Sequence, residues 1–170
     1  MNKWNEVTKF HGHECPGLAI GYRLALDALK ILKVDKSVDE ELLAIIETDA
    51  CGADAIQVLT GCTFGKGNFF FKDLGKHALT LISRDKNQGV RLGLKYGVLT
   101  GKNRNDKIDN IFSLSTEKLF TIKYYDSIND KPDKAVINES YQCINCKEAV
   151  MKTRTKNKTG NTLCITCSEN

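Results

Sequence analysis

The chain has 170 residues, of which 41% are hydrophobic and 27% are charged, as in ordinary globular proteins. Its net charge of +4 is too small to require a nucleic-acid partner, and no apolar run approaches the roughly 18 residues of a membrane span. The first residues lack the apolar core of a signal peptide. We therefore expect a cytoplasmic protein with no membrane contact and no nucleic-acid partner.

The first predicted helix covers residues 16–32. Pro16 suits the first helical position, because its ring fixes φ and its missing N–H would have no partner there, so Cys15 should lie at or near the N-cap. Apolar side chains recur at spacings of four and three, which places them on one buried stripe. These side chains are Leu18, Tyr22, Ala25, Leu29 and Leu32.

The next elements alternate between strands and a helix. Residues 42–48 form an apolar run that predicts a buried strand, and a short helix over residues 53–59 should end at Gly61. Strands are predicted over residues 68–72 and 77–83, and we expect these two strands to pair as a hairpin.

The pattern beyond residue 89 is weaker. It predicts helices over residues 90–96, 105–112 and 116–119, followed by a strand over residues 121–125. Together with the earlier elements, this pattern indicates an α+β fold class.

Three segments are expected along the chain. Residues 1–126 should form the α+β domain, and the polar residues 127–139, which include Pro132, should form a linker. Residues 140–170 should form a small module that resembles a zinc ribbon or a treble clef.

Two Cys-x-x-Cys pairs, Cys143 with Cys146 and Cys164 with Cys167, lie 17 residues apart. This spacing is typical of zinc ribbons and related fingers, in which a tight turn aims both thiolates of a pair at one ion. A segment this short, with few large apolar side chains, needs such a metal in order to fold. Four thiolates leave no open position, so the zinc should be structural. The alternative is a pair of disulfides or redox dithiols.

Basic residues also gather in this module, namely Lys147, Lys152, Arg154, Lys156 and Lys158. Between residues 152 and 158 there is no aromatic side chain that could stack on nucleic-acid bases. We therefore interpret the basic residues of this segment as the solvated side of a strand.

The densest chemistry near the start of the chain is formed by His11, His13 and Cys15. On an extended backbone, residues at i, i+2 and i+4 point to the same side, and Pro16 favours extended geometry at Cys15. The helix N-terminus would favour the thiolate form of Cys15. Imidazole and thiolate together suit zinc or a similar transition metal. The alternative is two surface histidines beside a structural cysteine.

A second group of polar residues surrounds the predicted helix over 53–59. Cys51 and Cys62 bracket this helix, and Asp54 and Gln57 share one of its faces. Either cysteine could equally be a small core residue. Lys66, in the following glycine-rich turn, could offer a cation to an acidic ligand.

The segments FHGHECPGLAIGYR (residues 10–23), CGADAIQ (51–57) and GCTFGKGN (61–68) resemble the FmdE family of formylmethanofuran dehydrogenase proteins. The four-cysteine module is similar to the tail that many members carry. The resemblance implies an α+β domain, an intertwined homodimer, and a His-x-Cys segment that lines a cleft suited to a metal. The family is named after a multi-subunit molybdenum or tungsten enzyme, of which FmdE is one component. Because this chain shows neither a pterin-binding domain nor an iron–sulfur run, we do not expect it to be that catalyst by itself.

Two main functional hypotheses follow. The first is a metal-binding accessory protein of redox or one-carbon metabolism, alone or in a larger enzyme complex, with a small-molecule ligand of unknown identity. Its second metal would be held by His13, Cys15 and Cys62, and Cys15 would be the nucleophile or redox thiol if no metal binds. Its cleft would be lined by His11, Cys51, Asp54, Gln57 and Lys66.

The second hypothesis is a regulatory or sensor protein whose zinc module contacts protein or nucleic acid. A purely structural subunit of a larger complex is a third interpretation. Three consecutive phenylalanines at residues 69–71 are compatible with a homodimer, in which a partner copy would cover the ring that points away from the core. The alternative is a strand buried on both faces within one chain, and the family resemblance favours the dimer.

Overall fold

The computed structural model describes residues 2–158 and 160–169. The chain divides into two compact units, one ending at Lys134 and one beginning at Ala135. The first is an α+β domain, and the second is a small module that carries four cysteines. Among the described residues, no helix combines the length and the apolar character that crossing a membrane requires.

The first unit is built on a five-stranded sheet with the order β2-β1-β3-β4-β5. Strand β1 pairs in parallel with β2, and the other neighbours are antiparallel. The strands are β1 (Leu42–Ile46), β2 (Phe69–Phe71), β3 (Ala78–Ser83), β4 (Gln88–Leu94) and β5 (Phe120–Tyr125).

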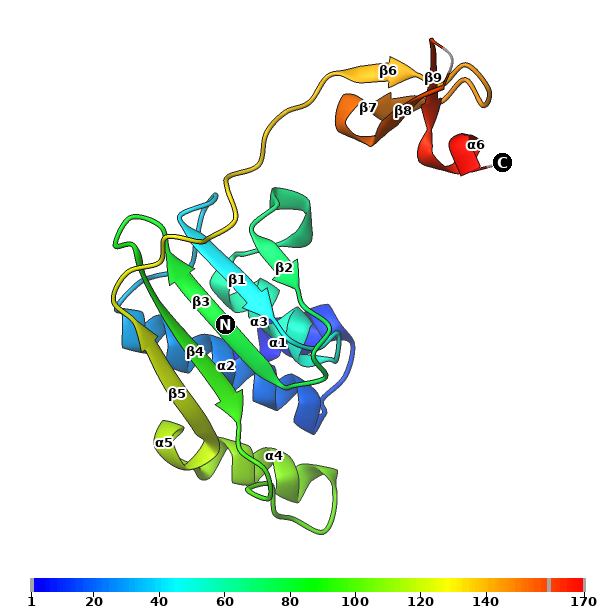
Figure 1. The fold of residues 1–170 in the computed structure, drawn as a ribbon. Helices are drawn as coiled ribbons and strands as arrows, with labels where there is room; N and C mark the ends of the chain where they lie inside the picture. Colours follow the sequence, from blue (N-terminus) through cyan, green and yellow to red (C-terminus); the bar gives the residue numbers. More distant parts are fainter. Residues whose placement is uncertain (1, 159, 170) are drawn as a thin grey trace. The chain divides into compact units, whose positions relative to one another are not determined.

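Helices cover one face of this sheet (Figure 1). The apolar side chains that alternate along β1, β3 and β4 join those of α2 in a single buried core. The helical elements are α1 (Lys3–His11), α2 (Pro16–Leu32), α3 (Gly52–Thr60), the 3₁₀ turn η1 (Phe64–Lys66), α4 (Arg104–Ser113) and α5 (Thr116–Leu119).

Helix α1 was not predicted from the sequence. Its N-cap is Asn2, whose side chain accepts a hydrogen bond from Trp4 N at 3.1 Å. The ring of Trp4 packs edge-on against Tyr22 of α2 and Phe112 of α4, with centroids 5.3 and 5.0 Å apart. These contacts hold α1 against the domain, and this fixes the position of His11 at its end.

The sequence predicted a hairpin of the two strands that are now β2 and β3, and this prediction is wrong. Both strands flank β1, because β1, α3 and β2 form a crossover unit that returns β2 parallel to β1. The antiparallel partner of β1 on its other side is β3.

The predicted helix over residues 90–96 is also wrong, because this segment lies mostly in β4. Val90 and Leu92 are fully buried on the helix-covered face, and Arg91 lies between them on the opposite face. This is the period of two that a strand requires.

Part of the segment predicted as a linker packs on the first unit. A Cβ atom built on Gly89 would lie 2.6 Å from Ile128 Cδ1, so the chain crosses β4 closely on the face away from the helices. Arg84 then donates hydrogen bonds to the carbonyls of Pro132 and Asp133, at 2.8 and 3.1 Å. The remainder leads to the second unit.

The second unit contains two small antiparallel sheets, β6 with β7 and β8 with β9. Its elements are β6 (Ser140–Gln142), β7 (Ala149–Met151), η2 (Lys152–Arg154), β8 (Thr155–Lys158), β9 (Asn161–Cys164) and α6 (Ile165–Glu169).

Helices α2 and α3 approach one another at two glycines. A Cβ built on Gly21 would lie only 2.2 Å from the carbonyl oxygen of Gly52 and 2.3 Å from its Cα. No side chain fits there, because these atoms belong to the backbone and cannot move aside cheaply. The contact therefore fixes how closely the N-terminal ends of both helices can lie.

We expect Gly21→Ala to lower the free energy of unfolding by about 2 kcal/mol, because overpacking exceeds the gain in helix propensity. Gly17→Ala in the same helix is the matched control, since its Cβ would make only ordinary contacts, 3.4 Å or longer. Urea unfolding followed by circular dichroism measures both. Equal stability of the two variants would show that the close contact does not constrain the fold.

Candidate metal centres

The four cysteines of the second unit converge, with their sulfurs all within 4.8 Å of one another. Cys143 follows β6 and Cys146 lies in the β6–β7 turn, whereas Cys164 ends β9 and Cys167 lies in α6. The cluster can hold a metal ion.

Backbone N–H groups and neighbouring sulfurs set the protonation of this cluster. The N–H of Cys164 donates to Cys143 Sγ at 3.3 Å, and this bond, with the N–H of Cys146, lowers the pKa of Cys143 to about 6. The pKa of Cys167 is raised to about 12, chiefly by its hydrogen bond with Cys164 and by burial. Several thiolates so close together repel one another unless a cation lies between them, and four sulfurs are a donor set that suits Zn²⁺.

Metal removal should unfold the second unit alone. Bound structural zinc is worth on the order of 10 kcal/mol in such modules, more than this short segment gains from burial. We therefore expect chelation to collapse the NMR dispersion of residues 140–170 while signals of the first unit persist. A tail spectrum that stays unchanged after all metal is removed would contradict a structural role.

A second cluster lies between α1 and α2 and consists of His11, His13 and Cys15. Their ligand atoms all lie within 4.8 Å of one another. The predicted extended backbone is not what aligns them, because His11 is the last residue of α1. Gly12 follows with φ +91°, a left-handed conformation that ends the helix and turns the chain towards Cys15.

The loop that carries the cluster is held in place at Glu14 and at Cys15. Trp4 Nε1 donates to Glu14 Oε1 at 2.9 Å, and Arg104 donates to the backbone carbonyl of Glu14 at 3.4 Å. Cys15 is the N-cap of α2, as the sequence predicted, and its sulfur accepts the N–H of Leu18 at 3.3 Å.

His11 is oriented by an acidic residue from another helix. Its Nδ1 lies 2.7 Å from Asp54 Oδ2 in the first turn of α3, so the carboxylate accepts the Nδ1 proton. This assignment leaves the lone pair on Nε2, and among the described residues this buried atom has no hydrogen-bond partner. A carboxylate behind a histidine is the usual support of a metal ligand. The site therefore fits a metal ion at Nε2.

The other two side chains of the cluster differ in exposure. The ring of His13 lies 4.5 Å from that of His11, centroid to centroid, and His13 is exposed. Cys15 is buried, with 8% of its surface accessible. A metal held here would have protein ligands on its inner side and solvent on the side of His13.

Cys51 lies next to Cys15, at the N-cap of α3. A Cβ built on Gly17 would be 3.8 Å from Cys51 Sγ and 3.9 Å from Cys15 Sγ, so both sulfurs face the space that this glycine leaves. Burial raises the pKa of the Cys51 thiol, and its hydrogen bond with Cys15 raises it further. The two thiols form an adjacent pair.

The prediction that Cys62 joins His13 and Cys15 is contradicted by this geometry. Cys62 follows the C-terminus of α3, whereas Cys51 precedes its N-terminus, and nine helical residues span about 13 Å. Cys62 is fully buried, and burial raises the pKa of its thiol to about 11. It is a core residue.

Gln57 and Lys66 are also directed elsewhere. Gln57 Oε1 accepts the N–H of Phe64 at 3.3 Å, and Lys66 Nζ donates to the carbonyls of Val38 and Gly61 at 2.8 and 2.9 Å. These bonds hold the turn after α3. Of the predicted cleft residues, the structure brings His11, Cys51 and Asp54 to the cluster.

An ion pair on the face of the sheet away from the helices was not predicted from the sequence. Arg91 holds the carboxylate of Glu47 with two hydrogen bonds, at 2.6 and 2.7 Å. The available signal was an acidic residue directly after the apolar run of β1, where a buried charge requires a partner.

Comparisons with known proteins show the family of this chain and a protein of similar fold. Residues 10–138 match the family FmdE, which is described as the molybdenum formylmethanofuran dehydrogenase operon family. A tungsten formylmethanofuran dehydrogenase FmdE-like protein from Syntrophus aciditrophicus, known from a crystal structure, superimposes with a TM-score of 0.69 at 26% sequence identity. The superposition covers 96% of this chain and 89% of that protein.

A curated relative is much longer. A probable S-adenosyl-L-methionine-binding protein of Archaeoglobus fulgidus is 44% identical over 88 residues, which cover 49% of this chain and 24% of that protein. The chain thus spans about a quarter of the length of this relative.

Proposed function

This chain belongs to the FmdE family, and from that premise we propose that it is an accessory metalloprotein of redox or one-carbon metabolism. Its first unit would bind one transition-metal ion through His11, His13 and Cys15. The observation that carries the proposal is His11 Nε2, which is buried and finds no partner in the described part of the chain, while Asp54 fixes the opposite ring nitrogen. A buried imidazole nitrogen left unpaired costs free energy, and a metal ion at that position removes the cost.

The donor set supports a site that is open to ligands. Three protein ligands leave a position for water or a small molecule, as catalytic zinc sites do. A metal there would act as a Lewis acid towards the molecule that occupies this position. Asp54 would keep the His11 ring oriented, and His13 would lie beside the entry from solvent.

The biological setting rests on the family. Its members are named after formylmethanofuran dehydrogenase, and the structural relative is named as an FmdE-like protein of the tungsten enzyme. We propose that this chain serves such chemistry in the cytoplasm, by itself or within a larger complex. In this proposal the cysteine cluster of the second unit binds a structural zinc.

A second candidate is a thiol redox function, favoured by the adjacent thiols of Cys15 and Cys51. An acceptor disulfide would oxidise the pair: the two thiols lose two electrons and two protons and form one S–S bond, while the acceptor becomes two thiols. Metal binding at Cys15 would block this step.

A third candidate is a sensor for a small metabolite. The match to a probable S-adenosyl-L-methionine-binding protein supports it. Calorimetric titration of the full chain with S-adenosylmethionine tests this candidate directly, since a sensor of that compound must bind it whether or not the cluster holds metal.

Metal content distinguishes the first candidate from the others. We expect about two metal equivalents per chain in the wild type, because each of the two clusters would hold one ion. Cys15→Ser should remove one and spare the zinc of the second unit, and Cys143→Ser should do the reverse. Cys62→Ser is the matched control and should remove none. Elemental mass spectrometry measures the metal equivalents per chain in each variant. If the Cys15→Ser variant keeps the metal content of the wild type, the proposed site in the first unit is wrong.

We also propose a homodimer. Phe71, on edge strand β2, is 48% exposed, and Phe64 in the turn before this strand is 83% exposed. Because exposed aromatic rings gain free energy on burial, two of them so close together favour coverage by a second copy. Light scattering should give about twice the chain mass of 19.0 kDa. A mass of one chain at micromolar concentration would rule the dimer out.

A further inference from the structure

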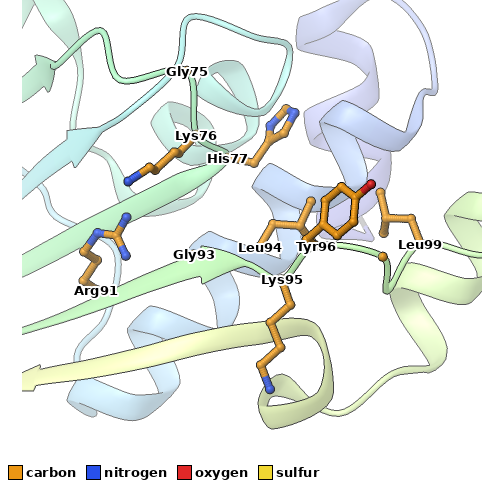
Figure 2. Close-up of a pocket in the computed structure, with 10 residues that line it drawn as sticks. Gly75, Lys76, His77, Arg91, Gly93, Leu94, Lys95, Tyr96 and Leu99 are labelled. Carbon is orange, nitrogen blue, oxygen red and sulfur yellow. The ribbon is translucent and has the colours of Figure 1, made fainter.

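A cavity of about 380 Å³ lies where β3 begins and β4 ends. It is lined by residues 75–77, which lead into β3, by residues of the second half of β4, and by the chain that leaves β4 up to Leu99 (Figure 2). The two strands hold both segments together, because Leu94 N donates to the carbonyl of His77 at 2.9 Å.

This cavity and the histidine–cysteine cluster lie at the same end of the sheet. Lys86, in the turn between β3 and β4, donates to the carbonyls of Leu32 and Lys33 at the C-terminus of α2, at 2.9 Å each. Since α2 runs along the strands, its N-terminal residue Cys15 lies towards the opposite end, where the cavity is.

One side of the cavity is basic. Figure 2 shows Lys76 and Arg91 extending towards one another. The guanidinium of Arg91 is paired with Glu47, and the pKa of this carboxyl is held below its usual value, first by the hydrogen bond from Arg91 and also by the charges of Lys76 and Lys72. One carboxylate thus faces three cations, and within the described part of the chain the ammonium of Lys76 makes no hydrogen bond.

The other side of the cavity is formed by rings and an apolar side chain. His77, Leu94 and Tyr96 gather there, away from the two basic side chains (Figure 2). The ring of Tyr96 is fully exposed, whereas His77 is half-buried, and burial lowers the pKa of its imidazole. At neutral pH this side therefore offers neutral surfaces against which a planar group can stack.

A glycine makes room for the basic side. A Cβ built on Gly93 would lie 3.1 Å from Arg91 Nη1 and 3.2 Å from Thr121 Oγ1. The absence of this atom leaves room for the guanidinium beside β4, where it reaches Glu47 and also lines the cavity.

We propose that the cavity binds a small organic anion that carries a ring. Its carboxylate or phosphate would lie between Lys76 and Arg91, and its ring would lie against Leu94 and Tyr96. Charge-assisted hydrogen bonds to Lys and Arg are the strongest ones that proteins offer to such groups, and the excess positive charge around Glu47 supplies the attraction. This site is additional to the proposed metal function, because it shares none of the residues of the metal cluster.

The probes are phenyl phosphate and benzoate, with benzyl alcohol as the neutral analogue, and binding to the full chain is followed by NMR shifts. We expect at least one of the anions to bind with a dissociation constant of about a millimolar or tighter, and the alcohol to bind at least about tenfold more weakly. Comparison of the two anions shows whether the site prefers phosphate or carboxylate.

Variants locate the binding. Lys76→Gln should weaken the anion about tenfold, since it removes one charge without touching the Arg91–Glu47 pair. Lys95→Gln is the matched control, because Lys95 lines the same cavity but extends away from the other basic side chains in Figure 2. Its amine donates to the carbonyl of Glu117. Loss of this lysine should therefore change the dissociation constant less than about twofold. Tyr96→Ala should weaken phenyl phosphate but not inorganic phosphate.

Two results would overturn the inference. One is that neither anion binds the wild type more tightly than benzyl alcohol. The other is that the two lysine variants lose the same affinity, which would mean that the anions respond only to overall charge. Circular dichroism of each variant verifies that its fold is retained.

Discussion

The close approach of α2 and α3 at Gly21 and Gly52 is the constraint on which the candidate metal site depends. Because the two backbones touch there, Cys15 at the start of α2 lies beside Cys51 at the start of α3. Helix α1 packs on α3 as well, and there Asp54 lies 2.7 Å from His11 at the end of α1. The cluster thus forms where the ends of three helices meet.

The local features of the site were predictable from the sequence. Pro16 marks the start of α2 and so identifies Cys15 as its cap, and the spacing of the two Cys-x-x-Cys pairs is enough to predict a cluster of sulfurs. These signals act over a few residues, where backbone geometry alone limits the possibilities. The grouping of His11, His13 and Cys15 was predicted for a wrong reason, since a helix end and Gly12 align them rather than an extended strand.

Features that depend on distant residues were not predictable in the same way. His11 and Asp54 are 43 residues apart, and nothing local tells which helix supplies the acid. The exclusion of Cys62 follows only once α3 is seen to separate it from Cys51. Strand β4 was mistaken for a helix because a short apolar run fits both periods, and its pairing with β3 and β5 decides between them.

The sulfur of Cys15 has two tasks: it caps α2 through the N–H of Leu18, and it faces the histidines. Serine, aspartate and asparagine can cap a helix equally well. None of these three residues offers the sulfur that a soft metal prefers. Exchange of Cys15 for serine should therefore keep the cap of α2 and remove the one sulfur donor from the His11, His13 and Cys15 cluster. The position before Pro16 thus separates what the fold requires, a capping acceptor, from what a soft metal would require, a sulfur.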